Sequence, residues 1–186
     1  MEVIGADQDD EAGLWLERLA DGDPSALEML YDEFGPHLYR YALAMLGRPE
    51  AAEDGLQELF LDLARSRGKL GHVRSVRAYL FAMLRHAIWR RLRRNGSGEF
   101  SVDPATIFQR PEPRGLPEGA AADIESALAK LPAEQKEVIV LKVYQDMTFP
   151  EIAEVTGVSA NTATSRYRYA LDRLRALLPP DLLQER

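Results

Sequence analysis

A group of polar side chains with distinctive spacing lies in the C-terminal part of the chain, around a predicted turn. Thr148 and Glu151 match the capping box, in which a hydroxyl and a carboxylate satisfy each other's backbone donors at a helix start. Gly157 follows, and Ser159 is placed to cap a second, longer helix. This order predicts a helix-turn-helix, whose second helix enters the DNA major groove by its N-terminal residues. An ordinary helical hairpin is the alternative, because these signals also occur in helical bundles.

The second helix of this unit has two chemically distinct faces. The apolar face, which must pack inward, comprises Ala163, Tyr167, Ala170, Leu171, Leu174 and Leu178. The opposite face displays Asn161, Ser165, Arg168, Tyr169 and Asp172, flanked by Thr162 and Arg166. Amides, hydroxyls and arginines at a helix start can read base edges and hold phosphates. The pattern therefore favours DNA binding.

A second candidate for nucleic-acid binding is a strongly basic segment in the middle of the chain. Residues 63–98 contain ten basic side chains, nine of them arginine, and no acidic one. Residues 1–23 contain eight acids and one base, which accounts for the whole net charge of −7. Arginine binds phosphate bidentately, so the segment indicates a polyanion partner. A solvated, solubilising face is the alternative.

The helix expected within this segment carries an outward-facing tryptophan. Its core stripe comprises Leu80, Met83, Leu84, Ala87 and Ile88, and its far side comprises Arg85, His86, Trp89 and Arg93. An exposed indole among arginines suits a single strand, because a base can stack on it whatever the sequence. Alternatively, Trp89 packs beneath a neighbouring helix or loop, as most tryptophans do.

Catalytic chemistry finds little support in the sequence. The absence of cysteine excludes disulfides, thiolate zinc sites and a cysteine nucleophile, and it fits a reducing cytoplasm. The three histidines have no metal-ligand spacing, and neither a Walker loop nor a nucleophile elbow is present. We therefore expect no catalytic residue, no metal and no cofactor. The acidic N-terminus argues against a signal peptide, and no apolar run is long enough to span a membrane.

The elements that must position these residues are all helices, since apolar residues recur at helical spacing along almost the whole chain. Helices are expected over 14–20, 24–46 with an interruption at Gly35-Pro36, 49–66, 75–94, 124–130, 132–145, 149–155 and 160–178. Asp23 is expected to cap the second of these helices and Ser75 the fourth.

Residues 95–122 break every helical pattern with repeated glycine and proline. Such a stretch is too long for a loop inside one compact domain, so it predicts a flexible linker between two domains. The expected organisation is an acidic extension over 1–22, favoured as a solubilising tail, a first domain over 23–94 and a second over 123–186.

The order of several short motifs resembles the extracytoplasmic-function (ECF) sigma factors of the sigma-70 family. The motifs are Ala52 to Phe60 (AEDGLQELF), Arg77 to Phe81 (RAYLF), Arg91 to Arg94 (RLRR), Leu131 to Gln135 (LPAEQ), and Glu151 to Glu154 (EIAE) with Ser165-Arg166. The resemblance implies two all-α domains joined by an extended linker, a region 2 bundle and a region 4 helix-turn-helix. It also implies a promoter-specificity subunit that binds core RNA polymerase and directs transcription initiation without catalysis of its own.

The resemblance assigns three groups of site residues. Polymerase binding falls on Asp54, Gln57 and Glu58. Minus-ten DNA recognition and melting fall on the loop over 66–74, including Arg74, and on Tyr79, His86, Trp89, Arg90, Arg93 and Arg94. Minus-thirty-five recognition falls on Asn161, Thr162, Thr164, Ser165, Arg166 and Arg168.

The partners that the resemblance implies are the polymerase and the promoter. The polymerase contacts are the clamp helices of the largest catalytic subunit and the flap of the second, and promoter DNA is bound both double- and single-stranded. An anti-sigma factor that holds the two domains is a further partner that the family allows. The expected location is the bacterial cytoplasm, associated with the nucleoid in the holoenzyme and without membrane insertion.

Three residues depart from the family pattern. Gly55 replaces an aliphatic residue within a helix, at a cost of up to about 1 kcal/mol. Arg90 stands where the family often has aspartate, and Thr164 replaces a frequent lysine or arginine.

Two rival functions remain at this level. A stand-alone helix-turn-helix regulator with a helical dimerisation or sensing domain would bind its operator alone, as a dimer. A helical hydrolase that uses the carboxylates over 53–58 would require a bound metal.

Overall fold

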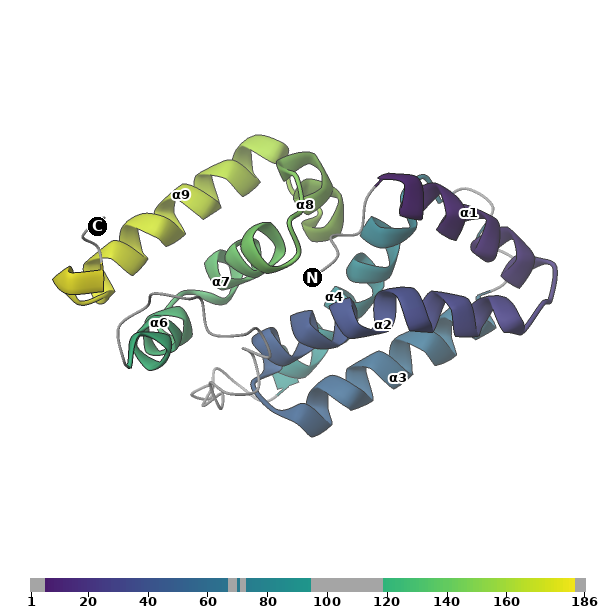
Figure 1. Ribbon diagram of the computed structural model, residues 1–186, viewed down its shortest axis with the longest axis horizontal. Coiled ribbons are helices and arrows are strands. Elements are labelled where there is room, and N and C mark those ends of the chain that lie inside the picture. Colours follow the sequence, from purple (N-terminus) through teal and green to yellow (C-terminus); the bar gives the residue numbers. More distant parts are fainter. Residues whose placement is uncertain (1–5, 67–69, 71–72, 95–118, 183–186) are drawn as a thin grey trace.

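The structure is a computed structural model that describes residues 6–66, 70, 73–94 and 119–182 (Figure 1). These residues form helices and contain no β-strand. The all-α expectation is therefore confirmed for the described part of the chain. Of the expected linker over 95–122, residues 95–118 lie outside the described residues, whereas Ala120, Ala121 and Ala122 are already helical.

The first half consists of helices α1 (Ala6–Ala20), α2 (Ser25–Leu46), α3 (Pro49–Arg65) and α4 (Val76–Arg94). Helices α2 and α3 lie side by side, and α4 packs against both (Figure 1). Apolar positions in phase with the helical repeat form the core, including Leu30, Phe34, Leu38, Tyr41, Leu59, Leu63, Leu80, Phe81, Leu84 and Ile88. The apolar stripe predicted for α4 therefore faces this core.

Helix α1 corrects the expectation of a solubilising tail. Its residues Ala12, Leu16 and Leu19 are buried against the bundle. Asp9 Oδ1 accepts a hydrogen bond from the backbone N–H of Arg77, at 2.8 Å, in the first turn of α4. The acidic segment is therefore part of the first bundle, because the hydrophobic gain of three core positions outweighs its charge density.

The turn between α1 and α2 is organised by Asp23. One of its carboxylate oxygens accepts from the Ser25 backbone N–H at 3.0 Å and from the Ser25 hydroxyl at 2.7 Å. The other accepts from Arg18 Nη2 at 2.7 Å. The hydrogen bonds from Ser25 and then from Arg18 lower the pKa of Asp23 to about 2. The helix begins one residue later than predicted, with Pro24 and not Asp23 as its N-cap residue. Asp23 nevertheless satisfies the Ser25 N–H at the helix start from two residues before it.

Helix α2 runs without a break through Gly35 and Pro36, so the expected interruption there is wrong. Proline removes one backbone donor and crowds the preceding turn. Phe34 and Leu38 are fully buried on either side of it. Burial of both flanks in the same core holds the two halves of the helix in register.

Gly55 is buried in α3, and an added methyl group would have room there. A Cβ at this position would lie 3.5 Å from Leu84 Cδ1, which is ordinary van der Waals contact. We expect Gly55→Ala to raise the free energy of unfolding by about 0.5–1 kcal/mol, because alanine loses less backbone entropy in a helix. Urea denaturation measures the change.

Gly157→Ala is the matched control, because Gly157 has a φ of 70°. A side chain in this left-handed conformation is strained, so the free energy of unfolding of this variant should fall by about 1 kcal/mol. If Gly55→Ala also loses stability, the space beside Leu84 is not available.

The second half consists of α6 (Ala120–Ala129), α7 (Ala133–Ile139), η2 (Val140–Tyr144), α8 (Phe149–Thr156), α9 (Ala160–Leu177) and η3 (Pro180–Leu182). The helix expected over 132–145 is corrected in its last part, since η2 is a π-helical turn. The backbone N–H of Gln145 donates to Val140 O at 3.2 Å, and Asp146 leaves the turn with a φ of 52°. The wider turn redirects the chain into the helix-turn-helix.

The two halves pack against each other. One apolar cluster joins Leu38, Leu80 and Phe81 of the first half to Val138, Leu141, Ile152 and Val155 of the second. Helix α8 contacts α4, and α7 and η2 contact α2 (Figure 1). A smaller cluster of Leu128, Leu131, Ile139 and Ala170 lies within the second half alone. The division into separately folding domains at 23–94 and 123–186 stays a prediction.

Candidate nucleic-acid and protein interfaces

The helix-turn-helix has the caps that its sequence predicts. Glu151 Oε2 accepts from the Thr148 backbone N–H at 2.6 Å, and Thr148 Oγ1 accepts from the Glu151 N–H at 3.4 Å. Gly157 ends α8, and Ser159 Oγ accepts from the Thr162 N–H at 3.1 Å to begin α9. The ring centroids of Phe149 on α8 and Tyr167 on α9 lie 5.6 Å apart. The caps and this ring pair set the angle at which α9 is presented.

The predicted minus-thirty-five residues gather at the start of α9. Asn161, Thr162, Thr164 and Arg168 are exposed, and Ser165 and Arg166 are half-buried. Thr164 Oγ1 donates to Ala160 O at 2.8 Å, and Arg166 Nη2 pairs with Glu134 Oε2 at 2.8 Å. The surface is thus polar and positively charged, although Arg166 must leave Glu134 to reach DNA.

The predicted minus-ten residues are distributed along α4 and the residues before it. Arg74, His86, Arg90 and Arg93 are exposed, and Tyr79 is half-buried. Burial raises the pKa of the Tyr79 hydroxyl, so it remains a hydrogen-bond donor at neutral pH. The side chain of Arg94 and residues 67–69 and 71–72 of the predicted loop lie outside the described residues. Arg74, His86 and Arg93 can reach a polyanion without rearrangement, whereas Arg90 must first leave Glu58.

Trp89 does not point freely into solvent in this conformation. It is half-buried, and its indole Nε1 donates to Glu137 Oε1 of α7 at 2.9 Å. The Arg85 guanidinium lies 5.2 Å from the centre of the indole ring. Of the two interpretations that the sequence allows, packing against a neighbouring helix describes this state.

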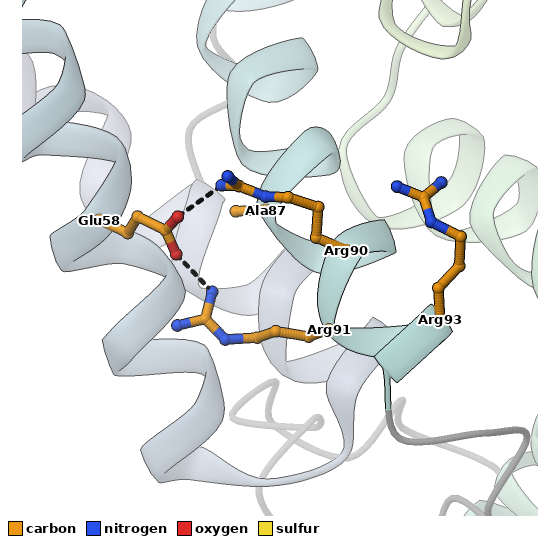
Figure 2. Close-up of a pocket in the computed structure, with 5 residues that line it drawn as sticks. All are labelled: Glu58, Ala87, Arg90, Arg91 and Arg93. Atoms are coloured by element: carbon orange, nitrogen blue, oxygen red, sulfur yellow. Dashed lines mark hydrogen bonds and ion pairs between the residues drawn. The ribbon is translucent and has the colours of Figure 1, made fainter.

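Figure 2 shows how two arginines, Arg90 and Arg91, hold Glu58 at the junction of α3 and α4, while Arg93 projects away from it. Arg90 donates to Glu58 Oε1, and Arg91 Nη1 donates to Glu58 Oε2 at 2.9 Å. Together with Ala87 and Arg93, these residues line a pocket of about 330 Å³. Glu58, predicted as a polymerase contact, therefore also positions two basic side chains within the chain.

The other two predicted polymerase contacts lie on the outer face of α3. Asp54 and Gln57 are exposed, three positions apart. Leu61, at 55% exposed, continues the same face and is absent from the sequence-based prediction. A groove of about 440 Å³ borders this face and is lined by Tyr31, Gly35, Pro36, Tyr39, Glu53, Leu56 and Gln57. The face combines acidic, amide and apolar groups.

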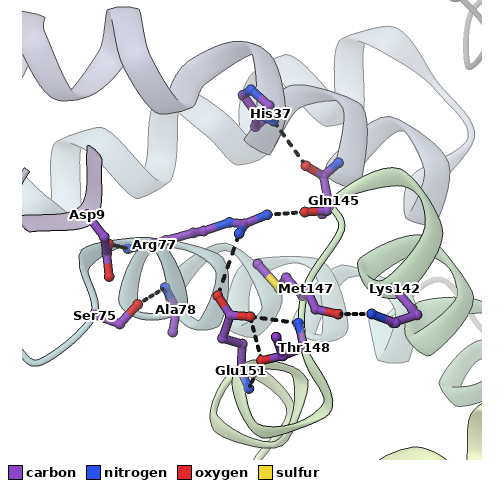
Figure 3. A network of polar contacts seen from close by, with 10 residues as sticks. All are labelled: Asp9, His37, Ser75, Arg77, Ala78, Lys142, Gln145, Met147, Thr148 and Glu151. Carbon is purple, nitrogen blue, oxygen red and sulfur yellow. Dashed lines mark hydrogen bonds and ion pairs between the residues drawn. The ribbon is translucent and has the colours of Figure 1, made fainter. Parts of the chain in front are cut away.

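Two buried charged residues between the halves, Arg77 and Glu137, are absent from the sites predicted from the sequence. Figure 3 shows Arg77 of α4 reaching across to the second half, where it donates to the backbone oxygen of Gln145 and pairs with Glu151 Oε1 at 3.5 Å. Burial lowers the pKa of Arg77, and the nearby Glu151 and Asp9 oppose this effect. Glu137 has one available sequence signal, since it lies four positions before Leu141 on an apolar stripe.

The described residues contain no group of three or more histidine, cysteine, aspartate or glutamate side chains that could hold a metal ion. Within the same part of the chain, no helix is both long enough and apolar enough to cross a membrane.

Comparison with known proteins decides the family. Residues 30–98 match the family model of sigma-70 region 2, and residues 121–174 match that of sigma-70 region 4. The ECF RNA polymerase sigma factor SigL of Mycobacterium tuberculosis is 33% identical over 165 residues, which cover 86% of this chain and 92% of SigL. The chain belongs to the sigma-70 family, in its ECF group. It is therefore a sigma subunit for transcription initiation, as the order of its motifs predicts.

Other relatives agree with this assignment. This ECF sigma factor is 28% identical to the RNA polymerase sigma factor CarQ of Myxococcus xanthus over 172 residues, 88% of this chain and 95% of CarQ. Among solved structures, CnrH in complex with the cytosolic domain of CnrY is similar with a TM-score of 0.70 and 25% identity, covering 89% of this chain and 96% of that one. The α2–α4 bundle lies largely within the region 2 match, as do α8 and α9 within the region 4 match.

Proposed function

We propose that this sigma factor binds core RNA polymerase mainly through the outer face of α3 and the adjoining groove on α2. The observation that supports this proposal is the exposed set of Asp54, Gln57 and Leu61 on one face of the region 2 bundle. Leu61 and Tyr31 are large hydrophobic residues, and 55% and 51% of their respective surfaces are exposed. Exposed apolar groups beside polar ones are typical of a protein-protein contact.

The partner surface that fits this face is a helical element with basic side chains and an apolar anchor. Glu53 and Asp54 place two exposed carboxylates at the rim of this face. Acids at a rim speed the approach of a basic partner, and an apolar centre supplies most of the affinity. The clamp helices of the largest polymerase subunit are the partner that we propose, with the flap of the second subunit as the contact of region 4.

Promoter DNA is the second partner. The exposed polar start of α9 suits the major groove of the minus-thirty-five element, and the arginines of α4 suit the minus-ten element and its separated strand. The sigma factor itself supplies recognition and no catalytic step. Its place of action is the bacterial nucleoid, within the holoenzyme.

An anti-sigma factor is the third partner that we propose. The similar protein CnrH was solved in complex with the cytosolic domain of CnrY. A protein that covers the α3 face would compete with polymerase for the same apolar residues.

The polymerase contact is tested by Asp54→Lys and Leu61→Asp. We expect each to weaken binding to core polymerase about tenfold or more, because each introduces an unfavourable group at the contact. Fluorescence titration of the labelled full-length chain with purified core enzyme measures the affinity, and circular dichroism checks the helical content.

Glu17→Lys is the matched control, since Glu17 is an exposed acid on α1, away from the α3 face. The affinity of this variant for core polymerase should equal that of the parent. Parent-like affinity in both α3 variants would exclude this face as the polymerase contact. Tight operator binding by the chain alone, as a dimer, would instead support a stand-alone regulator.

A further inference from the structure

The contact between the two halves is centred on one carboxylate. Glu137 of α7 is fully buried, and its Oε1 accepts three hydrogen bonds. The donors are Tyr41 Oη at 2.8 Å, Arg85 Nε at 3.0 Å and Trp89 Nε1 at 2.9 Å. All three donors belong to the region 2 half, whereas Glu137 belongs to the region 4 half. Glu137 therefore links the two halves through hydrogen bonds.

This hydrogen-bonded link is strong yet reversible. A buried carboxylate needs donors, and a charged donor such as Arg85 contributes more than a neutral one. Burial and the neighbouring Glu137 raise the pKa of Tyr41 well above its usual value, so its hydroxyl stays a donor. Among the described residues, Glu137 Oε2 has no hydrogen-bond partner. If the halves separate, water can satisfy both oxygens, so separation carries a compensating gain.

The link to Glu137 engages Trp89 and Arg85, two residues that single-stranded DNA would need. The Trp89 indole, the proposed stacking surface, is held by Glu137 on one side and by Arg85 near its ring. A second contact, from Arg77 to Gln145 O and Glu151, fixes the start of α8 on α4 (Figure 3). A base cannot take the place of α7 while these bonds persist.

We propose that Glu137 is an autoinhibitory latch: it closes region 4 over region 2 in the free sigma factor and withholds Trp89 and Arg85 from single-stranded DNA. This proposal depends on the proposed role of α4 in minus-ten binding. Separation of the halves, driven by polymerase binding, releases both side chains for the separated strand. The latch lowers the affinity of the free chain for DNA and leaves the holoenzyme competent.

The latch can be observed without DNA or polymerase. The chain contains two tryptophans, Trp15 and Trp89, so Trp15→Phe makes Trp89 the sole indole reporter. In this background we expect Glu137→Gln to increase acrylamide quenching of Trp89 at least twofold and to shift its emission to longer wavelength. Glutamine keeps the size of the side chain but loses the charge that Arg85 requires.

A distance measurement provides the second readout. The chain has no cysteine, so Asp32→Cys on α2 and Arg173→Cys on α9 give a unique pair for spin labels, both at exposed positions. The parent should give one short distance distribution, and Glu137→Gln should add a longer, broader one. Glu154→Gln is the matched control, since Glu154 is an exposed acid on α8 of the same half.

DNA binding by the free chain then tests inhibition itself. With a fluorescent single-stranded minus-ten oligonucleotide, we expect Glu137→Gln to bind at least fivefold more tightly than the parent and Glu154→Gln to match the parent. Unchanged quenching and distances in Glu137→Gln overturn the latch, whatever the DNA result. Separation of the halves without tighter DNA binding overturns its inhibitory role, whereas failure of the holoenzyme to open promoters would instead contradict the proposed function.

Discussion

Replacing Trp89 with alanine is expected to reduce promoter opening by the holoenzyme about 5- to 150-fold. Stacking of one base on an aromatic side chain contributes about 1–3 kcal/mol, and the unpaired base exists only after the duplex opens. Closed-complex formation should be nearly unchanged, because it depends on duplex contacts of α9. Permanganate reactivity of promoter thymines measures strand opening directly.

Trp89→Phe separates stacking from the contact with Glu137. Phenylalanine keeps an aromatic surface but has no N–H to donate to Glu137 Oε1. We expect this variant to open the duplex promoter at least as well as the parent, because it stacks and is no longer held. On a promoter with a pre-melted bubble, all three proteins should give similar reactivity. If Trp89→Ala opens the duplex as well as the parent does, Trp89 serves only the packing between the halves.

The second large effect is on stability. We expect Arg77→Met to lower the free energy of unfolding by about 2–4 kcal/mol, because removing one partner of a buried ion pair leaves the other uncompensated. The Arg77 side chain is 6% exposed and its partner Glu151 is 30% exposed, so the effect should fall below that of a fully buried pair. The change also leaves Gln145 O without this donor and loosens the start of α8. Urea denaturation followed by circular dichroism measures it.

Arg74→Met is the control for this change. Arg74 lies three positions earlier and is exposed, so its replacement should alter stability by less than about 0.5 kcal/mol. Arg77→Lys should restore part of the loss, since one ammonium supplies the charge but not the planar fork. Equal stability of Arg77→Met and the parent would show that the contact between the halves does not contribute to folding.

Local sequence signals predicted the elements well. The apolar stripe of α3, with Leu56, Leu59 and Leu63 buried, follows from helical spacing alone. The helix-turn-helix follows from the capping box and from Ser159, because caps act within three or four residues along the chain. The ordered motifs then predicted the family, since two blocks in sequence are far more specific than either alone.

Local signals failed where a short segment has two competing tendencies. The charge of residues 1–23 suggested a tail, whereas Ala12, Leu16 and Leu19 are in phase for a helix that docks. Pro36 suggested a break in α2, but burial of its two neighbouring turns maintains the helix. In both cases tertiary burial outweighs a local preference that is small by comparison.

The sequence by itself determined most of the helices, the caps of the helix-turn-helix and the family, because these depend on residues close together in the chain. Only the tertiary structure decided which charges meet. Glu58 pairs with arginines 32 and 33 positions away, and Glu137 bonds to Trp89 and Tyr41 across 48 and 96 positions. Helical periodicity gives the face on which a side chain lies but not the element that packs against that face. The partner of a buried charge is therefore set by how the helices pack.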